Sequence, residues 1–288
     1  MTATSATVRQ DAHLTLGRVV RSEWIKFTSL RSTYWTTGII LVLWLGIALL
    51  FALTANFTAV GPDGQPIEPN DEMRQSVTMT AVTTGAFFGM LVAAIQGVLT
   101  ISGEYSTGMI RSSLAAVPGR LAVLLGKAVV VFVWMFLLGA VSSLGAYLVA
   151  LPFLGSYDLA VPLGSEELLA MLGAAAYLGI VGLFGLGIGT LVRSAAGGIA
   201  ITVAVLMVIP MALGVLSIWI DGIEDIVPYM LDSAGNAMMT IPSDTEAALP
   251  PGMEAPTVLA PPVAALVASA WAAVALVLGA LALKGRDA

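Results

Sequence analysis

The residues of this chain that come closest to a catalytic pattern lie between positions 119 and 128, where Gly119 is followed by Gly126, Lys127 and Ala128. A phosphate-binding loop requires G-x-x-x-x-G-K-[ST] between a strand and a helix, because its backbone N–H groups and lysine cradle the phosphates and its hydroxyl holds Mg²⁺. Here the glycines are too far apart and Ala128 replaces the hydroxyl. The segment does not predict ATP binding, and we interpret Lys127 as a basic residue at the membrane interface.

Other catalytic patterns are absent from the sequence. The chain contains no cysteine, which excludes disulfides, thiolate metal sites and thiol nucleophiles, and its one histidine, His13, cannot form a metal cluster alone. Neither H-E-x-x-H nor G-x-S-x-G occurs. We therefore expect no catalytic residue, no metal, no cofactor bound by this chain and no enzymatic activity of its own.

The elements that must position any functional residue are six long apolar stretches. The chain is 58% hydrophobic and 10% charged, and its mean hydropathy of +0.95 leaves a water-soluble fold nowhere to place that surface. A hydrocarbon core about 30 Å thick needs about 20 helical residues to cross it. The sequence therefore predicts an all-α integral membrane protein with six transmembrane helices, at about residues 35–55, 77–101, 128–151, 168–192, 195–220 and 262–283.

The basic residues predict the orientation. All of the twelve Lys and Arg residues except Arg74 fall in segments that flank the spans on one side, and segments rich in Lys and Arg stay in the cytoplasm. We therefore expect a multi-pass protein of the cell membrane with both termini cytoplasmic. Residues 1–13 are predicted to form a disordered cytoplasmic tail, residues 14–288 a single transmembrane domain, and residues 221–261 a long outer loop that contains a short helix around residues 228–239.

An amphipathic segment precedes the first span. Between residues 14 and 32 apolar side chains recur at helical spacing, while Arg18 and Arg21 lie on the opposite face; this pattern is typical of a helix lying in the membrane interface. Glu23 falls inside the apolar stripe, where a lone carboxylate would be costly. Two interpretations stay open: an intrahelical pair with Lys26 three residues later, or a salt bridge to another segment or subunit.

The predicted spans carry no Asp, Glu, His, Lys or Arg in their interiors. Ion-coupled transporters place such groups at mid-membrane in spite of their cost, so this absence argues against a secondary transporter. Gly185 and Gly189 form a G-x-x-x-G pattern, which predicts a close approach between helices. Pro210 predicts a kink in the fifth span, as a passive bend or as a gating hinge.

Three segments resemble the transmembrane subunits of bacterial type-2 ABC exporters, the ABC transporter permeases. They are RSEWIKFTSLRS at residues 21–32, EYSTGMIRSSLAAVP at 104–118 and YMLDSAGNAM at 229–238. They are spread over most of the chain, and the six-span layout with both ends in the cytoplasm is similar to that family as well. The resemblance implies a permease that forms the substrate path, while a separate ATPase subunit binds ATP and Mg²⁺ and hydrolyses the nucleotide.

The resemblance also implies roles for particular residues. In the family, the loop after the second span, here residues 102–120, carries a coupling helix that docks on the ATPase, and the helix before the first span is a connecting helix. Two permease copies, identical or paralogous, pair so that spans two and five face the substrate path. These roles fall on Glu104, Tyr105, Ser106, Thr107, Gly108, Met109, Ile110 and Arg111 for ATPase coupling, on Glu23, Trp24 and Lys26 for the connecting helix, and on Thr80, Thr84, Phe87, Phe88, Met207 and Met211 for the substrate path.

The expected function is therefore ATP-driven export by a non-catalytic permease subunit. Its expected partners are the ABC ATPase, a second permease and membrane lipid, with no nucleic acid. Drug, lipid, peptide and polysaccharide export all fit the sequence. Two alternatives from other classes stay open, namely an ion-coupled secondary transporter and a membrane scaffold or sensor subunit that moves nothing.

Overall fold

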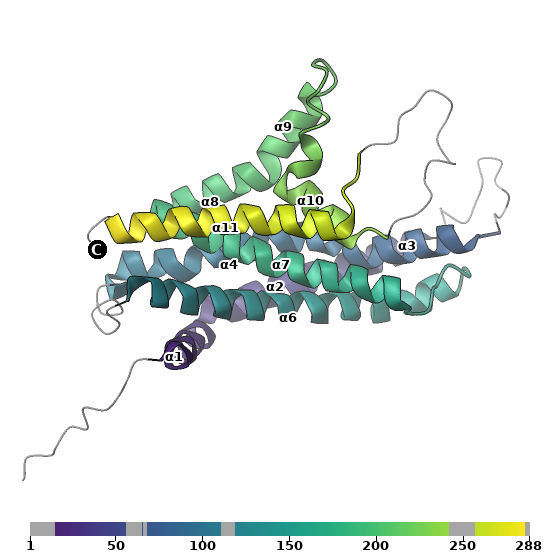
Figure 1. Cartoon of the computed structure of the whole chain (residues 1–288). Coiled ribbons are helices and arrows are strands. Elements are labelled where there is room, and N and C mark those ends of the chain that lie inside the picture. The colour runs from purple at the N-terminus through teal and green to yellow at the C-terminus, as the bar shows by residue number, and fades with distance from the viewer. Residues whose placement is uncertain (1–14, 56–64, 66–67, 111–118, 242–256, 286–288) are drawn as a thin grey trace, which may run out of the picture.

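The structure, a computed structural model, describes residues 15–55, 65, 68–110, 119–241 and 257–285 (Figure 1). Within these residues it is helical and contains no strand. Six helical stretches are long and apolar enough to cross a membrane: Arg31–Thr54, Asp71–Thr107, Arg120–Gly155, Ser165–Val192, Ala195–Leu216 and Pro261–Gly285. The prediction of an all-α protein with six such stretches is confirmed.

Several of these stretches are divided or flanked by shorter elements. The helices are α1 (Leu16–Ser29), α2 (Arg31–Thr54), α3 (Asp71–Thr83), α4 (Gly85–Thr107), α6 (Arg120–Gly155), α7 (Ser165–Val192), α8 (Ala195–Val203), α9 (Ile209–Leu216), α10 (Leu231–Met239) and α11 (Pro261–Gly285). A π-helical turn, Ala204–Val208, joins α8 to α9, and a 3₁₀ turn, Val227–Tyr229, precedes α10. The second and third stretches extend well beyond the predicted limits on the side of residues 108–119, because hydropathy detects only the part of a helix that crosses the hydrocarbon.

Helix α7 forms the centre of the bundle, packed against α4, α6 and α11. Its glycines permit this packing: a side chain at Gly185 would collide with the backbone carbonyl of Ala94 in α4, and a Cβ at Gly189 would lie 2.9 Å from the carbonyl oxygen of Val98. Small residues allow backbones to approach in this way and gain van der Waals contact. The close helix approach predicted from the G-x-x-x-G pattern is confirmed.

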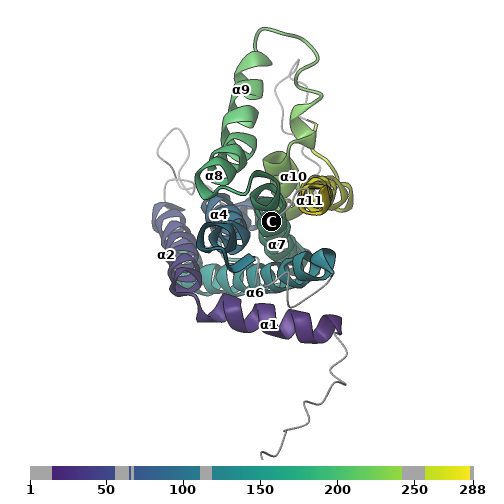
Figure 2. The same ribbon diagram turned by 90° about the vertical axis from the view of Figure 1, so that its left-hand side faces the viewer.

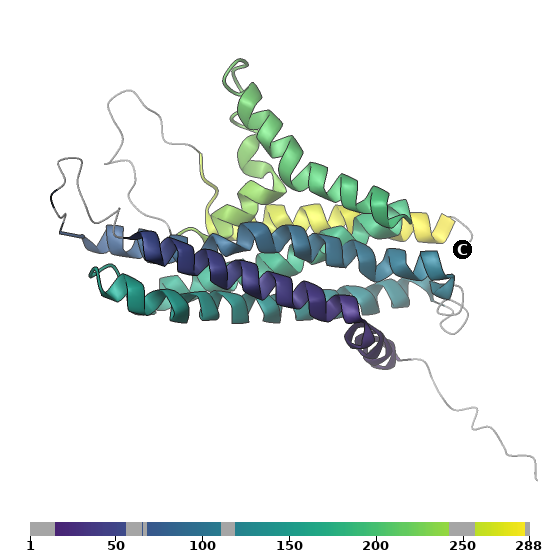
Figure 3. The same ribbon diagram turned by 180° about the vertical axis from the view of Figure 1, so that it is seen from behind.

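Helix α2 covers one side of α4 and α6, as the view from behind shows (Figure 3). Its fully buried Trp44 lies where α3 ends and α4 begins. The indole Nε1 donates a 2.7 Å hydrogen bond to the carbonyl oxygen of Val82. Gly85, the first residue of α4, leaves the space that the indole ring fills. The break between the two helices at Thr84 is therefore fixed by packing.

Helix α1 runs across the end of the bundle beneath α6 and packs against it (Figures 1 and 2). Val19, Glu23 and Phe27, spaced four residues apart, are buried against the bundle, while Arg18 and Arg21 are exposed. The end of α4, the start of α6 and the end of α11 lie at this same end (Figure 1). We call it the α1 end, and the opposite end, where α3 begins, the α3 end.

The fifth stretch leaves the bundle as it runs along α8 and α9 (Figures 1 and 2). The N–H of Ile209 donates to the carbonyl of Ala204, five residues back, directly before Pro210. A proline cannot donate the next helical hydrogen bond, and a π-helical turn is a recognised site of helix bending. The stretch ends as a helix at Leu216, four residues before its predicted limit.

Helix α10 confirms the short helix predicted within residues 228–239. It is buried on one side, through Leu231, Ala234, Met238 and neighbouring residues, and packs on α7 and α11. Gly235 lies against the ring of Tyr177, which is too close to admit a side chain. The long segment between α9 and α11 thus folds back onto the bundle; its residues 242–256 lie outside the described part of the chain.

Candidate functional site

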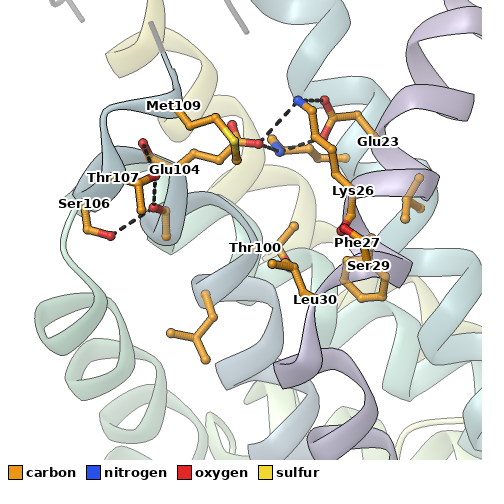
Figure 4. Close-up of a pocket in the computed structure, with 14 residues that line it drawn as sticks. Glu23, Lys26, Phe27, Ser29, Leu30, Thr100, Glu104, Ser106, Thr107 and Met109 are labelled. Atoms are coloured by element: carbon orange, nitrogen blue, oxygen red, sulfur yellow. Dashed lines mark hydrogen bonds and ion pairs between the residues drawn. The ribbon is translucent and has the colours of Figure 1, made fainter. Parts of the chain in front are cut away.

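Four charged side chains meet inside the α1 end of the bundle (Figure 4). The Nζ atom of Lys127 in α6 lies 2.6 Å from Glu23 Oε2 in α1 and 2.6 Å from Glu104 Oε1 in α4. Lys26 Nζ lies 2.8 Å from Glu23 Oε1 and 3.5 Å from Glu104 Oε1. We call these four residues the charge cluster. It contains two carboxylates and two ammonium groups and ties three helices together.

The sequence folds into this arrangement because small and aromatic residues bring α1 close to α6. A Cβ at Gly126, next to Lys127, would lie 3.0 Å from Val19 Cγ1 and 3.4 Å from Glu23 Cγ, so α1 passes directly over this glycine. Further along α6, Trp134 makes edge-on contacts with Trp24 and Phe27, each with ring centroids 5.7 Å apart. These contacts fix α1 so that Glu23 faces Lys127.

Because the charge cluster is buried, each of its charges needs a partner. Lys127 is only 2% exposed, and Glu23 and Glu104 are each 4% exposed. Charges removed from water to this degree are tolerated only when they are paired and hydrogen-bonded. Glu104 Oε2 is nevertheless buried without a hydrogen-bond partner.

Lys26 is the most exposed member of the cluster. Burial opposes its charge, but the hydrogen bond to Glu23 and the negative charges of Glu104 and Glu23 outweigh burial, so the pKa of Lys26 lies above its usual value. Lys26 therefore keeps its positive charge beside the two carboxylates.

The structure resolves the alternatives for Glu23 and gives Lys127 two buried partners. Glu23 makes both contacts, the intrahelical pair with Lys26 and a salt bridge to another segment through Lys127. Lys127 is not an exposed basic residue, because its ammonium group is enclosed by carboxylates from two other helices. The sequence did not predict the pairing of Lys127 with Glu23 and Glu104, because that pairing depends on three helices meeting. The only local signal was the acidic residue inside an apolar stripe.

The residues expected to couple to an ATPase divide between the bundle and its surface. Glu104 and Ile110 are buried and Tyr105 is half-buried, whereas Ser106, Thr107, Gly108 and Met109 are exposed. Residues 102–107 continue α4, and the helix ends at Gly108, whose φ of 72° suits glycine. Arg111, like residues 112–118 of the predicted coupling loop, lies outside the described residues.

Two arginines link this end of α4 and α6 to the last helix. Arg193 lies over the ring of Tyr105, 5.2 Å from its centroid, and its Nη2 donates a 3.1 Å hydrogen bond to the carbonyl oxygen of Ala282. Arg120 Nη1 donates a 2.9 Å hydrogen bond to the carbonyl oxygen of Leu283. Both satisfy carbonyl groups near the C-terminal end of α11, where positive charge is favourable. The sequence analysis placed both arginines among the basic flanks and gave them no partner.

A cavity of about 360 Å³ lies beside the charge cluster, between α1 and the last turns of α4 (Figure 4). The cluster residues line one side of it. Apolar and small residues complete the lining, among them Phe27, Leu30, Leu99, Gly103 and Val130.

The residues expected to form a substrate path lie on two separate parts of the fold. Thr80 and Thr84 line a more polar cavity of about 410 Å³ between α3 and α10. Phe87 and Phe88 follow in α4, in edge-on contact at 5.3 Å and both exposed. The exposed Met207 and Met211 lie in the π-helical turn and in α9, respectively.

Sequence comparisons do not assign a family to this chain. No family model matches the chain, and no curated protein matches it either. Among the described residues, no group of three or more His, Cys, Asp and Glu side chains could hold a metal ion. The function has to be argued from the geometry.

Proposed function

We propose that this chain is the transmembrane permease subunit of an ATP-binding cassette exporter. It forms the substrate path in the cell membrane, with both termini in the cytoplasm, and a separate ATPase subunit supplies the energy from MgATP. In this proposal the α1 end faces the cytoplasm, α1 lies in the inner interface as the connecting helix, and a second permease completes the transporter.

The observation that carries the proposal is the charge cluster. An ATPase outside the membrane must move helices inside it, which requires a rigid contact between the docking segment and the spans. Glu104 belongs to the last turn of α4, beside the exposed coupling residues, and it shares Lys127 with α1. A push on the end of α4 would therefore reach α1 and α6 together.

The exposed part of the coupling segment provides the docking surface in this proposal. Ser106, Thr107 and Met109 project from the α1 end beside the left-handed turn at Gly108. Their own charge is zero, so docking there relies on shape and on backbone contacts. The buried Glu104 and Ile110 hold the segment to the bundle from behind.

The uneven burial of the helices supports a second permease copy. In the apolar part of the fifth stretch, which contains Met207 and Met211, 11% of the residues are buried, against 67% in that of α7. Phe87 and Phe88 are also exposed. An apolar helix facing lipid is ordinary, but in this proposal the exposed side chains of both groups face a path that a second copy completes.

The charge cluster does not favour an ion-coupled transporter. Its charges are balanced, and Glu104 lies three residues from the end of α4, away from the middle of the span. Ionisable groups that carry coupling ions lie within the membrane along the ion pathway. We therefore keep ATP-driven transport as the single proposal.

A matched pair of arginine substitutions tests the docking surface. Ser106 and Ser156 are both exposed at a helix terminus, and each hydroxyl donates to the carbonyl three residues back, but Ser106 lies at the α1 end and Ser156 at the α3 end. The tagged chain is purified from its own membranes, and the amount of co-purifying ABC ATPase is measured. We expect Ser106→Arg to reduce that amount at least tenfold and Ser156→Arg to leave it unchanged.

Two outcomes would count against the proposal. One is the absence of any ABC ATPase from the purified wild-type chain. The other is equal recovery of the ATPase with both variants, which would place docking elsewhere. Transport driven by an ion gradient in liposomes that lack the ATPase would instead support the secondary transporter.

A further inference from the structure

The cavity beside the charge cluster has the features of a binding site for an amphiphile. Its lining is apolar toward Phe27 and Leu30 and charged toward Glu104 and Lys26 (Figure 4). Leu99 and Thr107, both in the lining, are eight residues apart in one helix, so the cavity extends about 12 Å along α4. A ligand with an apolar part and a polar head matches this division.

Glu104 indicates that the polar head of the ligand carries a hydrogen-bond donor. One oxygen, Oε1, accepts from Lys127, while the other, Oε2, is buried and has no hydrogen-bond partner. A buried carboxylate oxygen without a partner carries a desolvation cost that a hydrogen-bond donor removes. A primary ammonium group is such a donor, and its charge strengthens the bond.

Lys26 provides the complementary charge on the same side of the cavity. Its side chain is 34% exposed, and its ammonium group is held beside Glu23 and Glu104. A phosphate group next to Lys26 and an ammonium group next to Glu104 would together add no net charge to the cluster. A head that carries both charges therefore fits better than a simple cation or a simple anion.

We propose that this cavity binds a phospholipid with a phosphoethanolamine head. The ammonium group donates to Glu104 Oε2, the phosphate contacts Lys26, and an acyl chain runs along Phe27, Leu30 and Leu99. The proposal uses the membrane placement of the α1 end from the proposed function and does not depend on an ATPase. A lipid held there joins α1 to α4 in addition to the charge cluster.

Headgroup selectivity is the first test. The purified, delipidated chain is titrated with phosphatidylethanolamine and with phosphatidylcholine of the same acyl chains, and bound lipid is counted by native mass spectrometry. A trimethylammonium group has no N–H to donate. We expect phosphatidylethanolamine to bind at least about tenfold more tightly, which corresponds to about 1.4 kcal/mol.

Two glycine variants locate the site without altering any charge. Gly103 lines the cavity, and Gly46 lies in α2 outside it; a Cβ at either position meets nothing within 4 Å. Gly103→Phe should fill the cavity and abolish the selective binding, whereas Gly46→Phe should retain it.

Glu104→Gln, which places an amide beside the ammonium group, should remove the preference between the two lipids.

Three results would overturn the proposal. They are equal affinity of the wild type for the two lipids, selective binding that survives Gly103→Phe, and binding of soluble glycerophosphoethanolamine as tight as that of the lipid. The last would identify a site for a soluble headgroup. Because none of these measurements involves an ATPase, their failure leaves the proposed function untouched, and failure of ATPase capture leaves the lipid site untouched.

Discussion

Replacing Lys127 by methionine is the sharpest perturbation of the charge cluster. Methionine keeps the length and packing of the side chain but removes the ammonium group that lies 2.6 Å from Glu23 Oε2 and 2.6 Å from Glu104 Oε1. Two buried carboxylates would then share the single positive charge of Lys26. Removing one partner from a buried pair costs about 3–5 kcal/mol, because the remaining charge is left uncompensated.

The structure places the expected cost toward the lower end of that range. Lys26 stays within 2.8 Å of Glu23 and 3.5 Å of Glu104 and is partly exposed, so it can take up some of the lost interaction. We expect Lys127→Met to lower the free energy of unfolding by about 3 kcal/mol. Adding Glu104→Gln leaves one neutral pair, Glu23 with Lys26, and should restore about 2 kcal/mol.

The assay is reversible unfolding in mixed detergent micelles followed by tryptophan fluorescence, to which Trp24 in α1 and Trp134 in α6 contribute. Lys284→Met, an exposed lysine in the last turn of α11, is the control and should change the free energy of unfolding by less than about 0.5 kcal/mol. The reasoning is refuted if Lys127→Met matches this control, or if the double variant is as unstable as Lys127→Met alone.

The remaining predictions concern packing, protonation and orientation. Gly97→Ala should destabilise the chain by at least about 2 kcal/mol in the same assay, because its Cβ would collide with the backbone of α7, whereas Gly46→Ala should not destabilise it. Burial raises the pKa of Asp232, with hydrogen bonds from Ser233 and the backbone offsetting this in part, so its ionised form destabilises the folded state at neutral pH. Asp232→Asn should therefore be more stable than the wild type at pH 7, and a gain that persists below the ordinary carboxyl value of 3.8 would contradict this assignment. Since the chain has no cysteine, Ser156→Cys should react with an impermeant maleimide from outside the cell and Lys284→Cys only after permeabilisation; the reverse pattern would invert the proposed topology.

The six apolar stretches could be predicted from the sequence because crossing a membrane is a local property of about 20 residues. The close contacts of Gly185 and Gly189 were predictable for a similar reason, since few arrangements other than helix packing use such a pattern in an apolar span. The charge cluster was not predictable in this way. Glu23, Glu104 and Lys127 lie in three different helices. Glu104 and Lys127 resemble ordinary residues beside a span, and Glu23 shows only an acidic residue inside an apolar stripe until the helices are placed together.

The helix ends show a second limit. Hydropathy placed Glu104 beyond the second span, whereas α4 continues as a helix to Thr107 and carries Glu104 into the packed end of the bundle. Aromatic packing of Trp24 and Phe27 on Trp134 places α1 against α6, so that Glu23 reaches the same end, and no single-segment pattern contains that information.

The most direct test of the central claim is the MgATP hydrolysis that accompanies the chain when it is purified from its own membranes and placed in lipid nanodiscs. The proposal predicts hydrolysis by an ABC ATPase held in fixed ratio to the chain, and predicts that Ser106→Arg, but not Ser156→Arg, removes both the ATPase and the activity. A correctly inserted chain with no associated ATP hydrolysis, or with hydrolysis that both variants retain equally, would contradict it.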